Sequence, residues 1–226
     1  METSPVVFVL DDDESVATGL TRMLRARGYT VSPTTSPVEF LHRLDPAIPG
    51  CLVADICMPS MTGLELQDAL RAAGSTLPII FVSGCADIQV AVQGMRGGAI
   101  TFLTKPIRSE ELVMAIEEAV FKDLTQRELQ REREALLVRV MSLTTRERQV
   151  LALLAQGMLN KQVAAALRIS EKTIKVHRRR LMIKLRVRSS AQLFGLVGRL
   201  GSAADLKSWS GLDVTKLTSA TEGTCA

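Results

Sequence analysis

The sequence predicts a doubly wound α/β domain with a five-stranded parallel sheet, joined by a long helical linker to an all-α domain of four helices. First, strand and helix patterns alternate over residues 5–121. Second, the strand patterns are short and apolar, as in a parallel sheet that is buried on both faces. Third, only helical patterns occur over residues 142–200. These observations indicate two domains of different architecture.

The first predicted strand is Val6–Leu10, and it leads directly into Asp11–Asp13. Apolar residues then recur at helical spacing up to Gly28, a residue type that commonly follows the end of a helix. Tyr29–Val31 is predicted as the second strand, and Pro37–Leu44 as a short helix.

The third and fourth strands are apolar runs that each end on a polar residue. Cys51–Ala54 ends on Asp55, and a loop up to Gly63 separates it from the third helix. Ile79–Val82 ends on Ser83.

The last strand and helix pair follows the same scheme. Apolar residues over 88–95 mark the fourth helix, the run Phe102–Thr104 is the fifth strand and ends on Lys105, and Ser109 opens the fifth helix. Repeated strand and helix pairs imply right-handed crossovers.

The fifth helix is expected to continue as a charged linker helix, because no Gly or Pro occurs from Ser109 to Met141. The linker proper is assigned to residues 122–141. It could be a solvated spacer or the seam of a coiled-coil dimer. The apolar spacing is too irregular for a clean heptad repeat, which favours the spacer.

Charge is divided unevenly between the two domains. The chain carries a net charge of +4, but residues 142–200 hold thirteen Lys or Arg against two acids, a net +11 that leaves −7 for the rest. A strongly basic domain is typical of a protein that binds a polyanion such as DNA.

Nothing in the sequence predicts export or membrane insertion. We expect no signal peptide and no membrane span, because no apolar run approaches the required length of roughly 18 residues. The four cysteines lack the spacing of a zinc site, so reduced thiols in the cytoplasm are expected.

The polar residues that end the strands are expected to converge on one edge of the sheet, where ligands bind in such folds. They are an acidic cluster (Asp11–Asp13), Asp55, Ser83 and Lys105. Each alone is commonplace, since acids often decorate helix starts and a lone Asp often sits in a turn. Together they suit a divalent cation and a phosphoryl group.

These residues resemble the receiver domain of two-component response regulators, which has the flavodoxin-like fold. The resemblance rests on the Asp pair, on Asp-x-x-Met-Pro-x-x-x-Gly over 55–63, and on Ser-Gly and Lys-Pro. It implies that Asp55 accepts phosphate from a sensor histidine kinase. It also implies Mg²⁺, bound directly by Asp12, Asp55 and the carbonyl of Cys57, with Asp11 acting through water.

The same resemblance implies the parts of a switch. Ser83 is the switch hydroxyl, Phe102 the switch aromatic and Lys105 the phosphate-binding lysine, with a cis bond to Pro106. A phosphoryl group at Asp55 shifts the population toward an active state, in which the face of the fourth helix and fifth strand is remodelled.

Cys57 and Cys85 depart from the usual receiver pattern. In receivers the side chains at these two positions flank the phosphoryl group and influence its hydrolysis. A thiol positions an attacking water less well than a carboxylate or an amide, so a long-lived phosphoryl state is predicted. Both thiols are expected to be buried and inert.

The basic domain shows the pattern of a helix-turn-helix. Thr144 and Glu147 form a capping box, Asn160 is expected to cap the second helix, and Ser170 the third. Two short capped helices joined by a tight turn, the second strongly basic, fit this motif, although a basic solvated bundle would share the composition.

Several short motifs in this domain are similar to the LuxR/NarL-type DNA-binding domain. They are Leu-Thr-x-Arg-Glu (143–147), Ala-Gln-Gly (155–157), Asn-Lys (160–161), Ile-Ser-Glu-Lys-Thr-Ile-Lys-Val-His (169–177) and Lys-Leu (184–185). The resemblance places the helix-turn-helix at about Met158 to His177 and the third helix in the major groove. It implies base or nearby phosphate contacts from Lys175, Val176 and Arg179, and backbone contacts from Lys172, Thr173 and Arg178. His177 is expected to pack inward.

Together the two resemblances identify the chain as a member of the FixJ/NarL family of response regulators. They imply a receiver at 1–121, a DNA-binding domain at 142–202 and a disordered tail at 203–226, which Trp209 could pin to the protein. The expected partners are a sensor kinase, a double-stranded DNA operator, RNA polymerase if the protein activates transcription, and a second copy after phosphorylation. The fourth helix of the basic domain would form the dimer contact on DNA.

Two rival functions remain at this point. One is a DNA-binding protein that acts without phosphorylation. The other is a haloacid-dehalogenase-like phosphohydrolase with Asp11 as nucleophile, which Asp55-x-x-Met-Pro and the basic domain argue against. No catalytic residue is expected for an enzyme activity of the chain's own.

Overall fold

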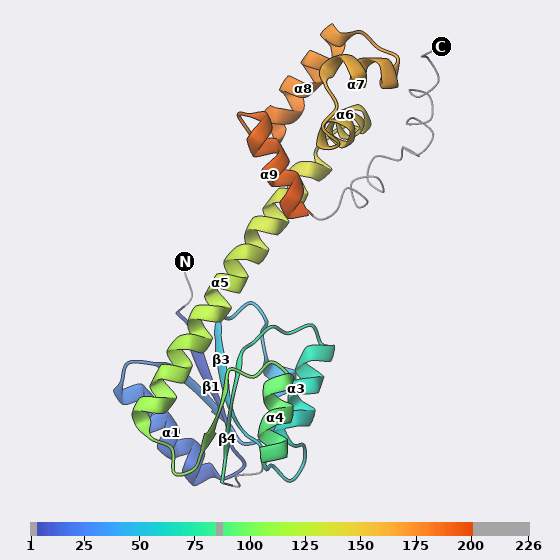
Figure 1. Cartoon of the computed structure of the whole chain (residues 1–226). Helices are drawn as coiled ribbons and strands as arrows, with labels where there is room; N and C mark the ends of the chain where they lie inside the picture. The colour runs from blue at the N-terminus through green and yellow to red at the C-terminus, as the bar shows by residue number, and fades with distance from the viewer. Residues whose placement is uncertain (1–3, 85–87, 201–226) are drawn as a thin grey trace. The chain divides into compact units, whose positions relative to one another are not determined.

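The computed structural model describes residues 4–84 and 88–200, and the chain divides into two compact units after Glu128 (Figure 1). The tail predicted over 203–226, Trp209 within it, and Cys85 lie outside the described residues. The two units are described separately below.

The first unit is built on a five-stranded parallel sheet with the order β2-β1-β3-β4-β5, which confirms the predicted doubly wound fold. The strands are β1 (Val6–Leu10), β2 (Thr30–Thr34), β3 (Gly50–Asp55), β4 (Ile79–Ser83) and β5 (Thr101–Thr104). Leu10 pairs with Ala54, and Ser83 pairs with Thr104. Asp11 and Asp55 therefore follow at the same level on adjacent strands.

Helices cover both faces of the sheet (Figure 1). They are α1 (Glu14–Ala26), α2 (Pro37–Arg43), α3 (Gly63–Ala72), α4 (Ile88–Arg96) and α5 (Ser109–Met141). Alternate residues of β1 point to different cores: Val7 and Val9 pack with α1 and α5, whereas Phe8 and Leu10 pack with α2 and α3. This double burial explains why the strands read as continuous apolar runs.

A buried ion pair fastens α5 to the sheet beyond the predicted domain boundary at residue 121. Asp123 is 1% exposed and accepts hydrogen bonds from the amide of Gly50 at 2.9 Å and from Arg127 Nε at 2.7 Å. The Arg127 guanidinium also donates to the carbonyls of Pro46 and Ile48. The first unit accordingly includes α5 as far as Glu128.

Up to residue 200, where the described part of the chain ends, the second unit contains the last part of α5 and four further helices. These are α6 (Thr145–Ala155), α7 (Asn160–Leu167), α8 (Glu171–Leu185) and α9 (Ser190–Leu200), as the sequence predicted. Their shared core includes Val150, Ile174 and Leu181, each essentially inaccessible to solvent.

The capping predictions for these helices were right in two cases and wrong in one. Thr144 caps α6 in a capping box with Glu147, and the Ser170 side chain accepts from the Thr173 amide at the start of α8. Asn160 does not cap α7. The cap position is Leu159, whose amide donates to Gln162 Oε1, so the side chain of Asn160 is left to bind elsewhere.

Glu147 also joins the start of α6 to the far end of α8. Its carboxylate is 3% exposed and accepts a hydrogen bond from Lys184 Nζ at 2.7 Å. Burial raises the pKa of Glu147, but the hydrogen bonds from Lys184 and Thr144 outweigh that effect and leave it below the ordinary value.

Among the described helices, none has an apolar stretch of the length that a bilayer crossing requires.

Candidate functional site

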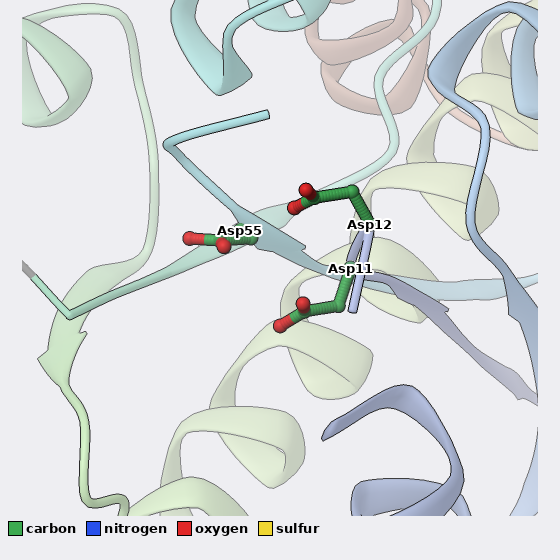
Figure 2. Close-up of side chains that lie close together, drawn as sticks. All are labelled: Asp11, Asp12 and Asp55. Atoms are coloured by element: carbon green, nitrogen blue, oxygen red, sulfur yellow. The ribbon is translucent and has the colours of Figure 1, made fainter. Parts of the chain in front are cut away.

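Three carboxylates meet at the edge of the sheet where β1 and β3 end. Asp11 and Asp12 follow β1, Asp55 ends β3, and Figure 2 shows the three side chains side by side. One oxygen from each lies within 4.8 Å of the others. Asp11 is 2% and Asp55 7% exposed, whereas Asp12 is open to solvent. The structure thus brings together the acids that were predicted to converge from the ends of the first and third strands.

Lys105 lies between two of these carboxylates. Its Nζ donates to Asp11 Oδ2 at 2.7 Å and to Asp55 Oδ2 at 3.1 Å. Burial lowers the pKa of Lys105, but its hydrogen bonds to Asp11 and Asp55 and their charges together raise it above the ordinary value. Lys105 is therefore a permanent cation at this edge, and its bond to Pro106 is cis.

The Asp55 carboxylate is oriented by its own loop. Oδ1 accepts from the amides of Ile56 at 2.7 Å and Cys57 at 3.3 Å, while Oδ2 faces Lys105. The loop then folds back on the strand, and a Cβ at Gly63 would lie 2.9 Å from the carbonyl oxygen of Asp55. This close approach explains why glycine stands eight residues after Asp55.

Ser83 and Cys57 border the same site. Ser83 is 1% exposed at the end of β4, and Cys57 Sγ lies 3.9 Å from Ser83 Oγ. The expectation that Cys57 is buried was wrong: its side chain is exposed, because residue 57 is already beyond the end of β3. The remaining predicted switch residue, Phe102, is half-buried against the core formed with α2 and α3.

The donor set at this edge fits Mg²⁺. This cation takes hard oxygen ligands and usually keeps several waters, so one or two carboxylates at an open edge are sufficient. Asp12 is exposed and Asp55 nearly buried, which gives a cation one open side and one side held by the protein. Asp13 is committed elsewhere, since it accepts from the amides of Ser15 and Val16 as the cap of α1. The Ser15 hydroxyl, which donates to the same carboxylate at 2.6 Å, and these two amides hold the pKa of Asp13 below its ordinary value.

The second site is the outward face of α8. Lys175, Val176 and Arg179 are exposed there, opposite the buried face that carries Ile174 and Leu181. Lys175 is paired with Glu171 at 3.2 Å, one helical turn away on the same helix. Because these side chains are exposed, this face of α8 can bind a polyanion without a change in the fold of the unit.

Three other residues of α8 were also predicted to contact DNA or to pack inward. Lys172 is exposed, Thr173 is half-buried with its hydroxyl 2.8 Å from that of Ser170, and His177 is half-buried. Their placement leaves Lys172 accessible and ties Thr173 to the cap of the helix.

Arg178 differs from its basic neighbours. Nη1 donates to Asn160 Oδ1 at 3.0 Å and Nη2 donates to Ser190 Oγ at 2.6 Å. These partners could not be predicted from the sequence, because Asn160 and Ser190 stand 18 and 12 residues away and belong to other helices.

Comparison with known proteins covers both units. Residues 7–117 match the family described as "Response regulator receiver domain", and residues 141–197 match "Bacterial regulatory proteins, luxR family". Nodulation protein W of Bradyrhizobium diazoefficiens is 39% identical over 203 residues, 90% of this chain and 89% of that protein. Response regulator protein TodT of Pseudomonas putida is 40% identical over 88% of each chain.

Solved structures agree with this match. Response regulator StyR is 43% identical with a TM-score of 0.80, covering 87% of this chain and all of that one. Full-length FixJ from B. japonicum is 34% identical with a TM-score of 0.55, covering 88% and 98%.

Proposed function

Because this chain belongs to the response regulators that join a receiver domain to a LuxR-type DNA-binding domain, we propose that phosphorylation of Asp55 controls its binding to DNA. The observation that carries the proposal is the placement of Asp55. Its carboxylate is held by two backbone amides and by Lys105, beside a second pair of acids. The families concerned are DNA-binding transcription regulators, which are not enzymes.

The proposed reaction is transfer from a phosphohistidine of a sensor kinase. A carboxylate oxygen of Asp55 attacks phosphorus, an acyl phosphate bond forms, and the bond from phosphorus to the histidine nitrogen breaks. Lys105 neutralises part of the charge that the phosphoryl oxygens bring to the site. The amides of Ile56 and Cys57 keep the attacking carboxylate in a fixed orientation.

We assign the divalent cation to the open side of the same cluster. Asp12, Asp55 and the carbonyl of Cys57 would hold Mg²⁺ directly, and Asp11 would act through a bound water. When bound, the cation supplies further positive charge for the phosphoryl oxygens.

The proposed output is a change in the surface around α4 and β5. Ser83 bonds the new phosphoryl group, Phe102 takes the space that Ser83 vacates, and two copies then associate through this surface. The exposed apolar side chains of α4 support the last step, because such groups favour contact with another surface. They are Ile88, Val92 and Met95, which are 78%, 43% and 45% exposed.

We further propose that α8 lies in the major groove of an operator. Lys175, Val176 and Arg179 would touch bases or nearby phosphates, and Lys172 and Thr173 would hold the backbone. A dimer would place two such helices on half-sites about one helical turn apart, or closer if it is compact. Transcriptional activation through RNA polymerase in the cytoplasm is the expected consequence.

The proposal is tested by treating wild type, Asp55→Asn and Asp68→Asn with acetyl phosphate and Mg²⁺. Asp68 is a suitable control because its side chain is 70% exposed on α3. Intact mass and dimer fraction are recorded together. A phosphoryl adduct and more dimer are expected in wild type and Asp68→Asn, but not in Asp55→Asn.

The other outcomes separate the rivals. An adduct in all three proteins would move the nucleophile to another acid, with Asp11 the first to test. DNA affinity that stays unchanged when the adduct forms would favour phosphorylation-independent binding. Turnover of phosphate monoesters that survives Asp55→Asn would revive a phosphohydrolase.

A further inference from the structure

We infer that Arg178 is a positioning residue of the DNA-binding unit, which fixes α8 against α7 and α9 and does not itself bind a DNA phosphate. The inference rests on the proposed use of α8 as the recognition helix. It assigns Arg178 a role different from the backbone contact that the family resemblance implied.

The guanidinium of Arg178 joins three helices. Asn160, which accepts from Nη1, is the first residue of α7, and Ser190, which accepts from Nη2, is the first residue of α9. All three residues are half-buried. One side chain of α8 therefore ties down the first turns of both neighbouring helices, and both of its terminal nitrogens are engaged inside the protein.

Arginine is suited to this role in a way that lysine is not. Its planar guanidinium presents several donors in a rigid fork, whereas a lysine ammonium is a single point charge on a flexible chain. Here Nη1 reaches Asn160 and Nη2 reaches Ser190, whereas a lysine would have to reach both acceptors with one nitrogen on a shorter side chain. Arg179 and Arg180, the next two residues, are exposed instead.

The side chains around Arg178 leave an open hollow beside this bridge. The hollow has a volume of about 530 Å³, and its lining includes Asn160 of α7, Glu171 of α8 and Phe194 of α9. The shared apolar core holds the helices together, and the two hydrogen bonds of Arg178 add a directional constraint at the first turns of α7 and α9. A helix that reads base edges needs its side chains held to within about half an ångström.

The salt dependence of DNA affinity distinguishes a positioning role of Arg178 from direct phosphate binding. Wild type, Arg178→Gln and Arg179→Gln are titrated against a random-sequence DNA duplex and against the duplex that wild type enriches from a random pool, at several salt concentrations. Loss of a phosphate contact lowers the slope of log K against log salt by about 0.9. We expect that loss for Arg179→Gln, which serves as the matched control one residue along the helix.

For Arg178→Gln we expect an unchanged slope on random-sequence DNA and affinity for the enriched duplex about 10-fold weaker. Ser190→Ala should weaken the enriched duplex in the same way, and combining it with Arg178→Gln should add little, because both changes break one bridge. Arg178→Lys should not restore affinity.

Opposite results would overturn the inference. They are a slope reduced in Arg178→Gln as in Arg179→Gln, or affinity restored by Arg178→Lys. If Arg179→Gln changes neither slope nor affinity while wild type binds DNA, the proposed role of α8 fails instead. Helical content by circular dichroism is checked for each variant, and the milder Ser190→Ala and Asn160→Ala variants keep the test decisive if Arg178→Gln does not fold.

Discussion

Lys105 and Asp11 are 94 residues apart in the sequence, yet the ammonium of one lies 2.7 Å from the carboxylate of the other. The lysine follows β5 and the aspartate follows β1, and only the parallel order of the sheet brings their ends to one edge. With Asp55 as its second partner, Lys105 acts as an internal cation for a cluster that would otherwise be strongly acidic.

Replacing Lys105 by Met should therefore destabilise the first unit when no divalent cation is present. Asp11 and Asp55 would remain buried without their cation, at a cost of about 1–3 kcal/mol. Added Mg²⁺ should recover more stability in this variant than in wild type. Denaturant unfolding with and without Mg²⁺ measures both effects, and Lys122→Met is the exposed control. An equal Mg²⁺ effect in both proteins would contradict the prediction.

The thiol at position 57 should lengthen the life of the phosphoryl group. Cys57 lies beside Ser83 at the site, and a thiol positions an attacking water less well than an amide. Cys57→Asn should therefore lose phosphate faster than wild type. Intact mass is followed after removal of the phosphoryl donor. Loss from wild type within seconds, or an unchanged rate in the variant, would disprove the idea.

The sequence was sufficient for the fold and for most of the candidate site at the sheet edge, because those signals are local. Strand endings on Asp11, Asp55, Ser83 and Lys105 can be located one at a time, and the topology then gathers them. Contacts between residues distant in the sequence did not have to be predicted one by one, since the carboxyl ends of all parallel strands lie at the same edge of the sheet.

The relationships that the sequence missed depend on partners brought together only by folding. Asp123 bonds the Gly50 amide across 73 residues, and Arg178 bridges residues of two other helices. The cap of α7 was missed because Gln162 satisfies the Leu159 amide from inside the helix. The sequence alone does not distinguish a basic residue that contacts DNA from one that hydrogen-bonds to a neighbouring helix.

The pair formed by Asp123 and Arg127 should be essential for the stability of the first unit. Asp123 is buried and Arg127 is its only charged partner among the ion pairs of the described residues. Arg127→Met should lower the free energy of unfolding by about 2–4 kcal/mol. Arg131→Met, on an exposed face of the same helix, should change it by less than about 0.5 kcal/mol.

Denaturant unfolding and hydrogen exchange at the Gly50 amide both report on this pair. Exchange should accelerate in Arg127→Met, because the carboxylate that accepts from Gly50 loses its support. Equal stability of the two arginine variants would show that the loop before β3 is held by packing alone.

Two cysteines of the first unit should differ sharply in reactivity. Burial, with a smaller contribution from the charge of Asp123, raises the pKa of Cys51 to about 12, so almost no thiolate exists at neutral pH. Cys57 is exposed. Iodoacetamide applied to the native protein should label Cys57 and spare Cys51, as mapped by peptide mass. Labelling of both at similar rates would contradict this, and denatured protein is the control.

Acid should weaken the second unit through Glu147. The folded state holds the pKa of this carboxyl below its ordinary value of 4.5, because Lys184 and Thr144 hydrogen-bond the charged form more strongly than burial opposes it. The unfolded state therefore binds the proton more readily than the folded state. The stabilisation is fully present above pH 4.5 and is lost as the pH falls through the lower folded pKa.

Glu147→Gln removes this titration but keeps an acceptor for the Thr144 amide. At neutral pH the variant should be less stable by about 1–3 kcal/mol, since Lys184 loses its charged partner. As the pH falls below 4.5 the difference from wild type should shrink, and it should be lost once the carboxyl is also protonated in the folded state, because both side chains are then neutral. Hydrogen exchange of the Val150 and Leu151 amides, followed across this pH range, measures the second unit within the full chain. A difference that stays constant from neutral pH into acid would show that Glu147 acts through shape and not through charge.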